Sequence, residues 1–198
     1  MRTFLNKIIN ILLPERHNYK IVRASKKLFI TPSVYSIDGL TVQYLLEFKH
    51  EKVRACIHEA KFHDNTRAQA LLGATIAQFI ETSLIKYDLV VPIPLSKERA
   101  RARGYCQVEQ ILKAGNVPFK TDILKRVDRP AQTSLTKEQR LQNVQGSFSV
   151  DSAKEDLIRN AHILLVDDVV TTGATLRAAQ AALVPHQPTS ITCLALAH

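Results

Sequence analysis

The sequence contains no tryptophan, one methionine and three cysteines among its 198 residues. The cysteines, Cys56, Cys106 and Cys193, are odd in number and far apart, which argues against a disulfide framework and indicates a reducing, cytoplasmic environment. No apolar run reaches the length of a membrane-spanning helix. The P-loop pattern G-x-x-x-x-G-K-[ST] is also missing, so a P-loop nucleotide site is excluded.

Positive charge is in excess. The chain has 27 Lys and Arg against 18 Asp and Glu, a formal net charge of +9. Such a balance favours polyanionic partners, either phosphorylated metabolites or nucleic acid, although a solvated basic surface gives the same count. The length fits one α/β domain with a small appendage.

The most informative stretch is residues 162–183, HILLVDDVVTTGATLRAAQAAL. Its apolar start, Ile163 to Val166, is typical of a buried parallel strand, and the Ala- and Leu-rich end from Leu176 to Leu183 predicts a helix. The junction between them lies at the carboxyl end of a strand, where ligands bind in open α/β sheets.

The chemistry of that junction fits a sugar phosphate. A helix start with small and hydroxyl-bearing residues attracts a phosphate. The residues concerned are Thr171, Thr172, Gly173, Ala174 and Thr175. Asp167 and Asp168 would repel a phosphate, but their carboxylates can accept hydrogen bonds from vicinal sugar hydroxyls. A receiver domain also begins with such a strand and two acids but needs more chain than the thirty residues after Asp168. A plain strand-to-helix turn is the other alternative.

A second anion site is predicted after the apolar strand Leu89–Ile93. The segment LSKERARARGY follows directly and places Lys97, Arg99, Arg101 and Arg103 in one predicted loop, before a helix that begins near Tyr105. Because carboxyl ends of parallel strands meet at one sheet edge, these cations would face the same ligand as the Thr residues. A solvated basic loop or a nucleic-acid patch is the alternative interpretation.

The N-terminal part has its own signals. Apolar residues at helical spacing predict an amphipathic helix before Pro14, and the missing small-residue cleavage site argues against a signal peptide. Packing on the domain or a partner, and peripheral membrane contact, are both open for this helix. Farther on, Pro32–Ile37 and Leu40–Glu47 flank Asp38-Gly39, which predicts a β-hairpin.

Two helices should follow, over His50–Phe62 and Asn65–Lys86, with Asp64 or Asn65 as the cap. A metal interpretation of His50, Cys56, His58 and His63 fits no familiar zinc spacing, and ordinary packing is preferred.

The segment before the central strand is long and polar. Residues 126–148 have little apolar periodicity, which favours a lid able to close on a ligand over a plain surface loop. A strand-like run precedes it between Pro118 and Arg126. Ser147–Val150 is expected to re-enter the sheet, Lys154–Asn160 to form a short helix, and Thr189–Ala197 to form a final strand.

Residues 163–175 resemble the phosphoribosyl pyrophosphate (PRPP) motif of type I phosphoribosyltransferases, an apolar strand, two acids, two apolar residues and T-T-G-x-T. The order of motifs also resembles the ComF branch of that superfamily. The matching segments are VPIPLSKERARARGYCQ, then Gln132, then Arg140 with Asn143, and then Gly146 to Phe148.

The resemblance implies an α/β, type I phosphoribosyltransferase-like fold, a mainly parallel twisted sheet with helices on both faces plus a small N-terminal hood that bears the hairpin. It assigns the ribose to Asp167 and Asp168 and the 5′-phosphate to Thr171–Thr175. Pyrophosphate with Mg²⁺ would lie against Ser96, Lys97, Arg99 and Arg103. Mg²⁺ would bind through PRPP, with Asp167 and Asp168 as the side chains in reach, and Gln132, Arg140 and Asn143 would belong to the lid.

The sequence departs from the family at its start. ComF proteins usually carry a four-cysteine zinc module after a Pro-terminated lead, whereas Glu15, Arg16 and His17 follow Pro14 here and no cysteine precedes Cys56. No zinc is therefore expected, and residues 1–33 are interpreted as a remnant of the module ahead of a domain at 34–198.

The family implies a PRPP-binding, phosphoribosyltransferase-like protein linked to natural competence and DNA uptake. If active, it would transfer the phosphoribosyl group to an acceptor that the sequence does not identify. The alternative is a non-catalytic module that senses PRPP or handles single-stranded DNA beside DNA-uptake proteins. Aromatic residues for base stacking are sparse, with only Tyr105 near the basic segment.

Overall fold

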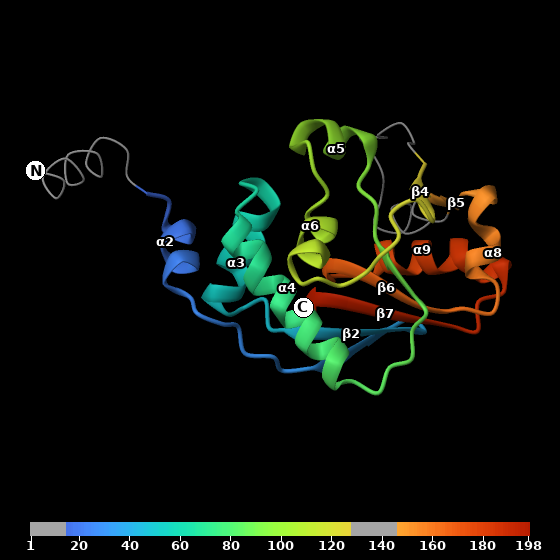
Figure 1. The fold of residues 1–198 in the computed structure, drawn as a ribbon, viewed down its shortest axis with the longest axis horizontal. Coiled ribbons are helices and arrows are strands. Elements are labelled where there is room, and N and C mark those ends of the chain that lie inside the picture. The colour runs from blue at the N-terminus through green and yellow to red at the C-terminus, as the bar shows by residue number, and fades with distance from the viewer. Residues whose placement is uncertain (1–14, 128–145) are drawn as a thin grey trace, which may run out of the picture.

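The computed structural model describes residues 15–127 and 146–198. Its centre is a five-stranded sheet in the order β1-β2-β7-β6-β3 (Figure 1). The strands are β1 (Ser33–Ile37), β2 (Leu40–Leu46), β3 (Leu89–Pro92), β6 (His162–Val169) and β7 (Ser190–Ala197). The pairs β2–β7, β7–β6 and β6–β3 are parallel, and β1 joins β2 in antiparallel fashion. The predicted mainly parallel α/β sheet is confirmed.

The hairpin forms where the sequence predicts it. Asp38 and Gly39 have φ values of 46° and 79°, the two positive values that a tight hairpin turn requires. Its second strand pairs with β7, so the hairpin is one edge of the main sheet and not a separate hood. Five of the seven residues of β2 are buried or nearly so on both faces, which is why this strand belongs inside the sheet.

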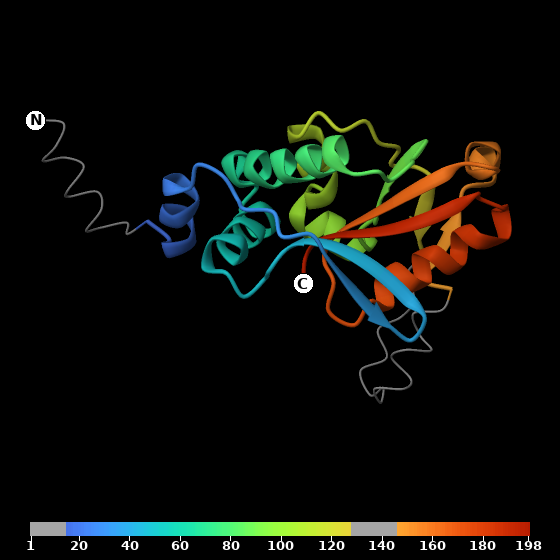
Figure 2. The same ribbon diagram turned by 90° about the horizontal axis from the view of Figure 1, so that it is seen from below.

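Helices cover both faces of the sheet (Figure 2). One face carries α3, α4 and α6, and the other carries α9. The helices are α2 (His17–Ala24), α3 (Glu51–Phe62), α4 (Thr66–Thr82), α5 (Lys97–Arg103), α6 (Gln107–Ala114), α8 (Glu155–Ile158) and α9 (Ala174–Leu183). Asn65 caps α4 as predicted, because its side chain accepts a hydrogen bond from the Ala68 N–H at 3.0 Å.

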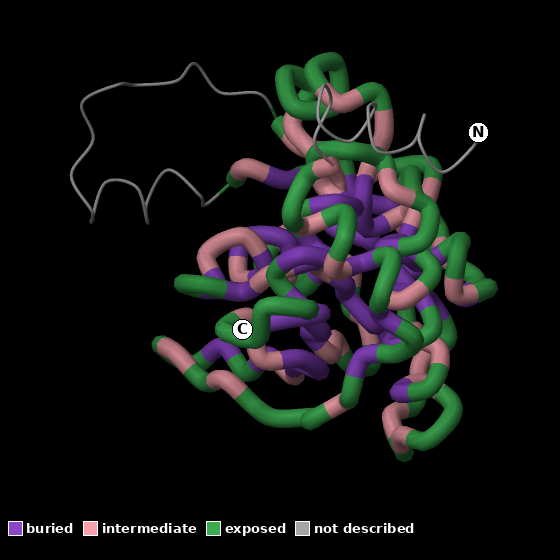
Figure 3. The backbone as a smooth tube through the Cα atoms, turned by 90° about the vertical axis from the view of Figure 1, so that its left-hand side faces the viewer, coloured by how far each residue is buried: buried purple, intermediate pink, exposed green. Residues whose placement is uncertain are grey.

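Alternation along β6 builds two cores. Leu164 and Val166 pack against α3, α4 and α6, whereas Ile163 and Leu165 pack against α9. Neighbouring residues of a strand point to opposite faces, so a strand covered on both sides is apolar throughout. Figure 3 shows the resulting buried centre within an exposed periphery.

Helices α4 and α6 meet at a pair of glycines. A Cβ atom on Gly73 would lie 2.5 Å from the Gly115 nitrogen, and one on Gly115 would lie 2.4 Å from the Gly73 oxygen. The contact is backbone against backbone, and it fixes α6 against the layer that carries α3.

Two short strands lie apart from the main sheet. β4 (Leu124–Arg126) and β5 (Phe148–Val150) pair with each other in antiparallel fashion. The prediction that residues 147–150 re-enter the main sheet is therefore wrong. Phe148 packs instead in the core on the α9 side, and a short turn over Ser152–Lys154 leads from β5 into α8.

No helix within 15–127 or 146–198 is both long and apolar enough to cross a membrane. The amphipathic helix predicted before Pro14 lies outside the described residues.

Candidate functional site

The two predicted ribose ligands lie at the end of β6. The strand continues past Val166 to Val169 because Asp167 and Val169 are in register with Ala195 and Ala197 of β7. Asp167 and Asp168 are thus consecutive residues at the end of the strand, and both line one cavity there. Asp168 shares the side of Val166, toward α3 and α6.

Asp168 is held by two residues that sequence reasoning missed. Its Oδ2 atom lies 3.3 Å from Nζ of Lys61 on α3 and accepts a hydrogen bond of 3.1 Å from Nε2 of Gln107 on α6. Arg103 in turn donates to Oε1 of Gln107 at 2.8 Å. Asp168 is only 6% exposed, so these partners supply the charge and hydrogen bonds that a buried carboxylate needs.

Asp167 lies in a different electrostatic environment. Its Oδ1 atom accepts a hydrogen bond from the Asp168 backbone N–H at 2.8 Å. Burial, and secondly the neighbouring Asp168 carboxylate, raise the pKa of Asp167 well above its usual range. The two neighbouring acids therefore differ: Asp168 is paired with Lys61, whereas Asp167 favours its protonated form.

The Thr loop connects β6 to α9. Gly173 adopts φ +69°, and a Cβ atom there would lie 2.8 Å from Leu40 Cδ2, so the loop packs directly on the hairpin. Thr172 Oγ1 accepts a hydrogen bond from the Ala174 N–H at 3.4 Å. Arg177 on α9 then donates to the carbonyls of Asp38 and Ile37 at 2.7 and 2.9 Å. The hairpin turn and the predicted phosphate loop are thereby held together.

The basic segment is a helix, not the predicted loop. Ser96 caps α5 by accepting a hydrogen bond of 3.3 Å from the Arg99 N–H, and no residue of α5 is buried. Seven residues without Gly or Pro, with Ser at the cap, form a helical turn readily. The positive charges consequently point in several directions from one exposed helix.

One cavity joins the predicted motifs. It has a volume of about 660 Å³, and Asp167, Asp168, Thr171, Thr175 and Arg99 all line it. The remaining members of the Thr loop, Thr172, Gly173 and Ala174, form the loop's turn and are not part of the cavity wall.

The four predicted pyrophosphate ligands do not all meet there. Ser96 and Lys97 line an adjacent cavity of about 700 Å³ together with Arg101. Arg126 borders both cavities, which are thus neighbours. Arg103 lies over the Phe62 ring at 5.2 Å and donates a hydrogen bond to Gln107. It therefore reaches Asp168 only indirectly, through the Gln107 side chain.

Helix α3 forms a further wall of this cavity, one that was not predicted from the sequence. Arg54, Ile57, His58 and Lys61 line it with the spacing i, i+3, i+4 and i+7, which places them on one helix face. This spacing could have predicted the cavity wall from the sequence, because three polar residues on one face of a helix that packs on the core need a polar environment. Phe48 and His198 complete this side.

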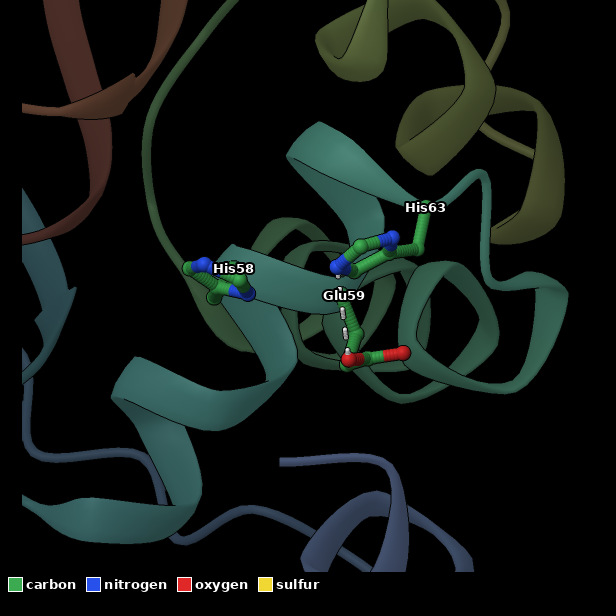
Figure 4. Close-up of side chains that lie close together, drawn as sticks. All are labelled: His58, Glu59 and His63. Carbon is green, nitrogen blue, oxygen red and sulfur yellow. Dashed lines mark ion pairs between the residues drawn. The ribbon is translucent and has the colours of Figure 1, made fainter. Parts of the chain in front are cut away.

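The histidines proposed in the metal interpretation are partly brought together. His58, Glu59 and His63 place their ligand atoms within 4.8 Å of one another (Figure 4). Glu59 is buried and already accepts hydrogen bonds from Arg16 at 3.2 and 3.0 Å and from Asn65 at 3.2 Å.

Burial opposes the ionisation of Glu59, but the bonds from Arg16 and Asn65 outweigh it and lower its pKa. Burial raises the pKa of Cys56 to about 12, which disfavours the thiolate that binds metals. Glu59 therefore joins Arg16, just before α2, to α3 and to the start of α4. The absence of zinc stays a prediction.

The predicted lid residues Gln132, Arg140 and Asn143 lie outside the part of the chain that the structure describes.

Parts of the chain are similar to known proteins. The family model for the phosphoribosyl transferase domain matches residues 109–198, which include β6, the two aspartates and the Thr loop. A solved structure described as the allosteric regulatory enzyme of purine biosynthesis aligns with a TM-score of 0.44 and 15% identity, over 72% of this chain and 30% of that one. The match of residues 109–198 to this domain agrees with the phosphoribosyltransferase-like α/β fold that the sequence predicts.

Curated relatives narrow the class. Competence protein ComFC of Streptococcus pneumoniae is 34% identical over 108 residues, 54% of this chain and 47% of the relative. Competence protein F of Haemophilus influenzae is 34% identical over 94 residues, 45% of this chain and 41% of the relative. The match spans less than half the length of these relatives. These similarities confirm the predicted resemblance to ComF-family competence proteins: the chain is similar to them over about half of its length.

Proposed function

We propose that this protein binds PRPP with Mg²⁺ and serves natural competence as a phosphoribosyltransferase-like component of DNA uptake. The observation that supports the site is the single cavity lined by Asp167, Asp168, Thr171, Thr175 and Arg99. It brings together groups that suit each part of PRPP.

Each part of PRPP is assigned to the residues of the cavity wall whose chemistry suits it. The ribose hydroxyls would bond to Asp167 and Asp168, and the 5′-phosphate would lie against the loop Thr171–Thr175 at the start of α9. Arg99 would pair with the pyrophosphate, and Ser96 and Lys97 would extend that contact from the neighbouring cavity. Arg103 would contribute by holding Gln107 against Asp168.

The donor set fits magnesium. Mg²⁺ prefers oxygen ligands and keeps several waters and phosphate oxygens, and Asp167 and Asp168 are the carboxylates at this edge of the sheet. When bound, the ion would neutralise charge on the pyrophosphate. The protein's own residues would position the ribose through the Lys61–Asp168 and Gln107–Asp168 contacts and pair the leaving group with Arg99.

The domain at 34–198 would carry this function. Residues 1–33 are proposed to be the remnant of the family's zinc module. A cytoplasmic location is part of the same proposal. The names of the two competence proteins support a role in DNA uptake, where DNA-uptake proteins would be the partners.

A second candidate is a non-catalytic role on single-stranded DNA. It is favoured by α5, which exposes Lys97, Arg99 and Arg101 on one short helix. Phosphate neutralisation predicts binding that weakens steeply as salt rises, and Arg101→Ala should reduce that slope. An unchanged slope would exclude α5 as the DNA contact.

Thermal unfolding with ligand fragments tests the proposed site. Mg-PRPP should raise the unfolding midpoint, and ribose 5-phosphate and Mg-pyrophosphate should each raise it less, because each fills part of the cavity. Thr175→Val should abolish the response to ribose 5-phosphate alone, and Arg99→Ala the response to Mg-pyrophosphate alone. The two variants control for each other. A midpoint that none of the three ligands moves would contradict the proposal.

A further inference from the structure

His198 is a positioned imidazole that the proposed function leaves without a role. It follows β7, and its backbone extends the sheet: its N–H donates to the Leu46 carbonyl at 3.2 Å, and its carbonyl accepts from the Phe48 N–H at 2.8 Å. Its ring centroid lies 4.1 Å from that of Tyr35 and 5.2 Å from that of Tyr44. The ring is thus oriented by the main chain and by two aromatic neighbours.

The tautomer of this ring follows from one contact. Nδ1 of His198 lies 3.0 Å from the Val170 carbonyl oxygen. A carbonyl oxygen can only accept a hydrogen bond, so Nδ1 carries the proton. In the neutral ring Nε2 is then unprotonated and has a lone pair. Within residues 15–127 and 146–198, no hydrogen-bond partner occupies Nε2.

The place of the ring connects it with the proposed ribose site. His198 lines the same cavity as Asp167, Asp168 and Thr171. Its partner Val170 directly precedes the Thr loop, and Val170 is itself tied to β7 through its N–H and the Ala197 carbonyl at 3.0 Å. Along the cavity, Arg99 and Pro94 mark the side proposed for pyrophosphate, whereas His198 and Phe48 belong to the ends of β7 and β2.

We infer that His198 is a catalytic residue that takes the proton of the acceptor during phosphoribosyl transfer. This inference rests on the proposed function. The acceptor's lone pair would form a bond to the anomeric carbon of PRPP, and the bond from that carbon to pyrophosphate would break, its electron pair leaving with pyrophosphate. The proton of the acceptor's N–H or O–H would move to Nε2 and from there to water. The acceptor is therefore a nucleophile that carries a dissociable proton.

The geometry favours this role over a purely structural one. A ring kept only for packing against Tyr35 and Tyr44 would not need to line a cavity shared with two carboxylates. A ring kept to bind a phosphate would place a donor toward it, whereas the Val170 contact assigns the only proton of the neutral ring to the other nitrogen.

The first test is the tautomer, measured on the full chain by ¹⁵N NMR of the histidine rings without ligand. The inference predicts the Nδ1–H form for His198. An Nε2–H form would overturn it.

The second test compares variants by pyrophosphate release from Mg-PRPP, with water as the acceptor. His198→Asn keeps an amide donor where Nδ1 bonds to Val170 and removes Nε2. It should bind Mg-PRPP with the wild-type dissociation constant but release pyrophosphate at least about 100-fold more slowly, the range that a general base contributes. Added imidazole should restore part of the loss, which a structural defect would not allow.

His162→Asn is the matched control. His162 begins β6 at the opposite end of the sheet and contacts Ser190 Oγ through Nδ1 at 2.7 Å, so its loss should not alter release. Equal rates in wild type and His198→Asn, or a wild type that binds Mg-PRPP and releases no pyrophosphate, would overturn the role of His198 and leave PRPP binding intact. A wild type that does not bind Mg-PRPP would refute the proposed function itself.

Discussion

Nζ of Lys61 lies 3.3 Å from Oδ2 of Asp168, joining α3 to the end of β6. The lysine side chain is 27% exposed and the aspartate side chain 9%. The pair therefore links the helical layer to the proposed ribose site under limited screening by solvent.

Lys61→Met should destabilise the protein at pH 7. It leaves the buried Asp168 carboxylate without its cation, a loss of about 1 to 3 kcal/mol in the free energy of unfolding. Urea denaturation measures this value. Lys49→Met is the control, because the Lys49–Glu47 pair is largely exposed and should contribute less than about 1 kcal/mol. Equal effects of the two substitutions would show that the Lys61–Asp168 pair is not a structural link.

Asp167 should make the unliganded protein less stable as pH rises. Because burial and Asp168 raise its pKa in the folded state, the unfolded chain loses this proton first, from about pH 4 upward. The folded state then binds more protons than the unfolded one, and stability falls with pH until the folded pKa is passed.

Asp167→Asn should remove this loss. The variant should unfold at a higher temperature than wild type at pH 7, and the difference should disappear below about pH 4, where both states of the wild type are protonated. Thermal melts at both pH values decide the matter. A variant less stable than wild type at pH 7 would show that the carboxylate is favourable in the free protein.

Gly73→Ala should be destabilising although alanine is the better helix former. A Cβ atom at 2.5 Å from the Gly115 nitrogen would push α6 away from α4, and overpacking of this kind costs about 1 to 3 kcal/mol. The exposed neighbour Ala74 provides the control: Ala74→Gly should cost about 1 kcal/mol through helix propensity alone. Denaturant unfolding that shows Gly73→Ala to be neutral or stabilising would contradict the close contact.

The strands and most helices were predictable from local pattern. The apolar run at 163–166 and the Asp38-Gly39 turn each allow one arrangement, because burial on both faces and positive φ restrict the residue types. The short strands β4 and β5 were harder to place, since three residues give no periodicity and a pairing partner is a property of the fold. The basic segment was predicted as a loop because its charges dominate its composition, although Ser96 and the absence of Gly or Pro favoured a turn of helix.

The site was predictable where its residues are consecutive and not where they come from distant elements. Asp167, Asp168 and the Thr loop follow one another in a motif, so their chemistry could be interpreted together. The same cavity is also lined by Lys61, Gln107 and His198, which lie 107, 61 and 30 positions from Asp168 in the sequence. Only the packing of α3 and α6 and the pairing of β7 bring them there.

The central claim is that the cavity at the end of β6 binds PRPP. Calorimetric titration of Mg-PRPP into the wild type and into Asp167→Asn/Asp168→Asn tests it most directly. The account predicts saturable binding to the wild type and its loss in the double variant, with both proteins folded by circular dichroism. Binding of equal strength to both proteins, or no binding to the wild type, would contradict the claim.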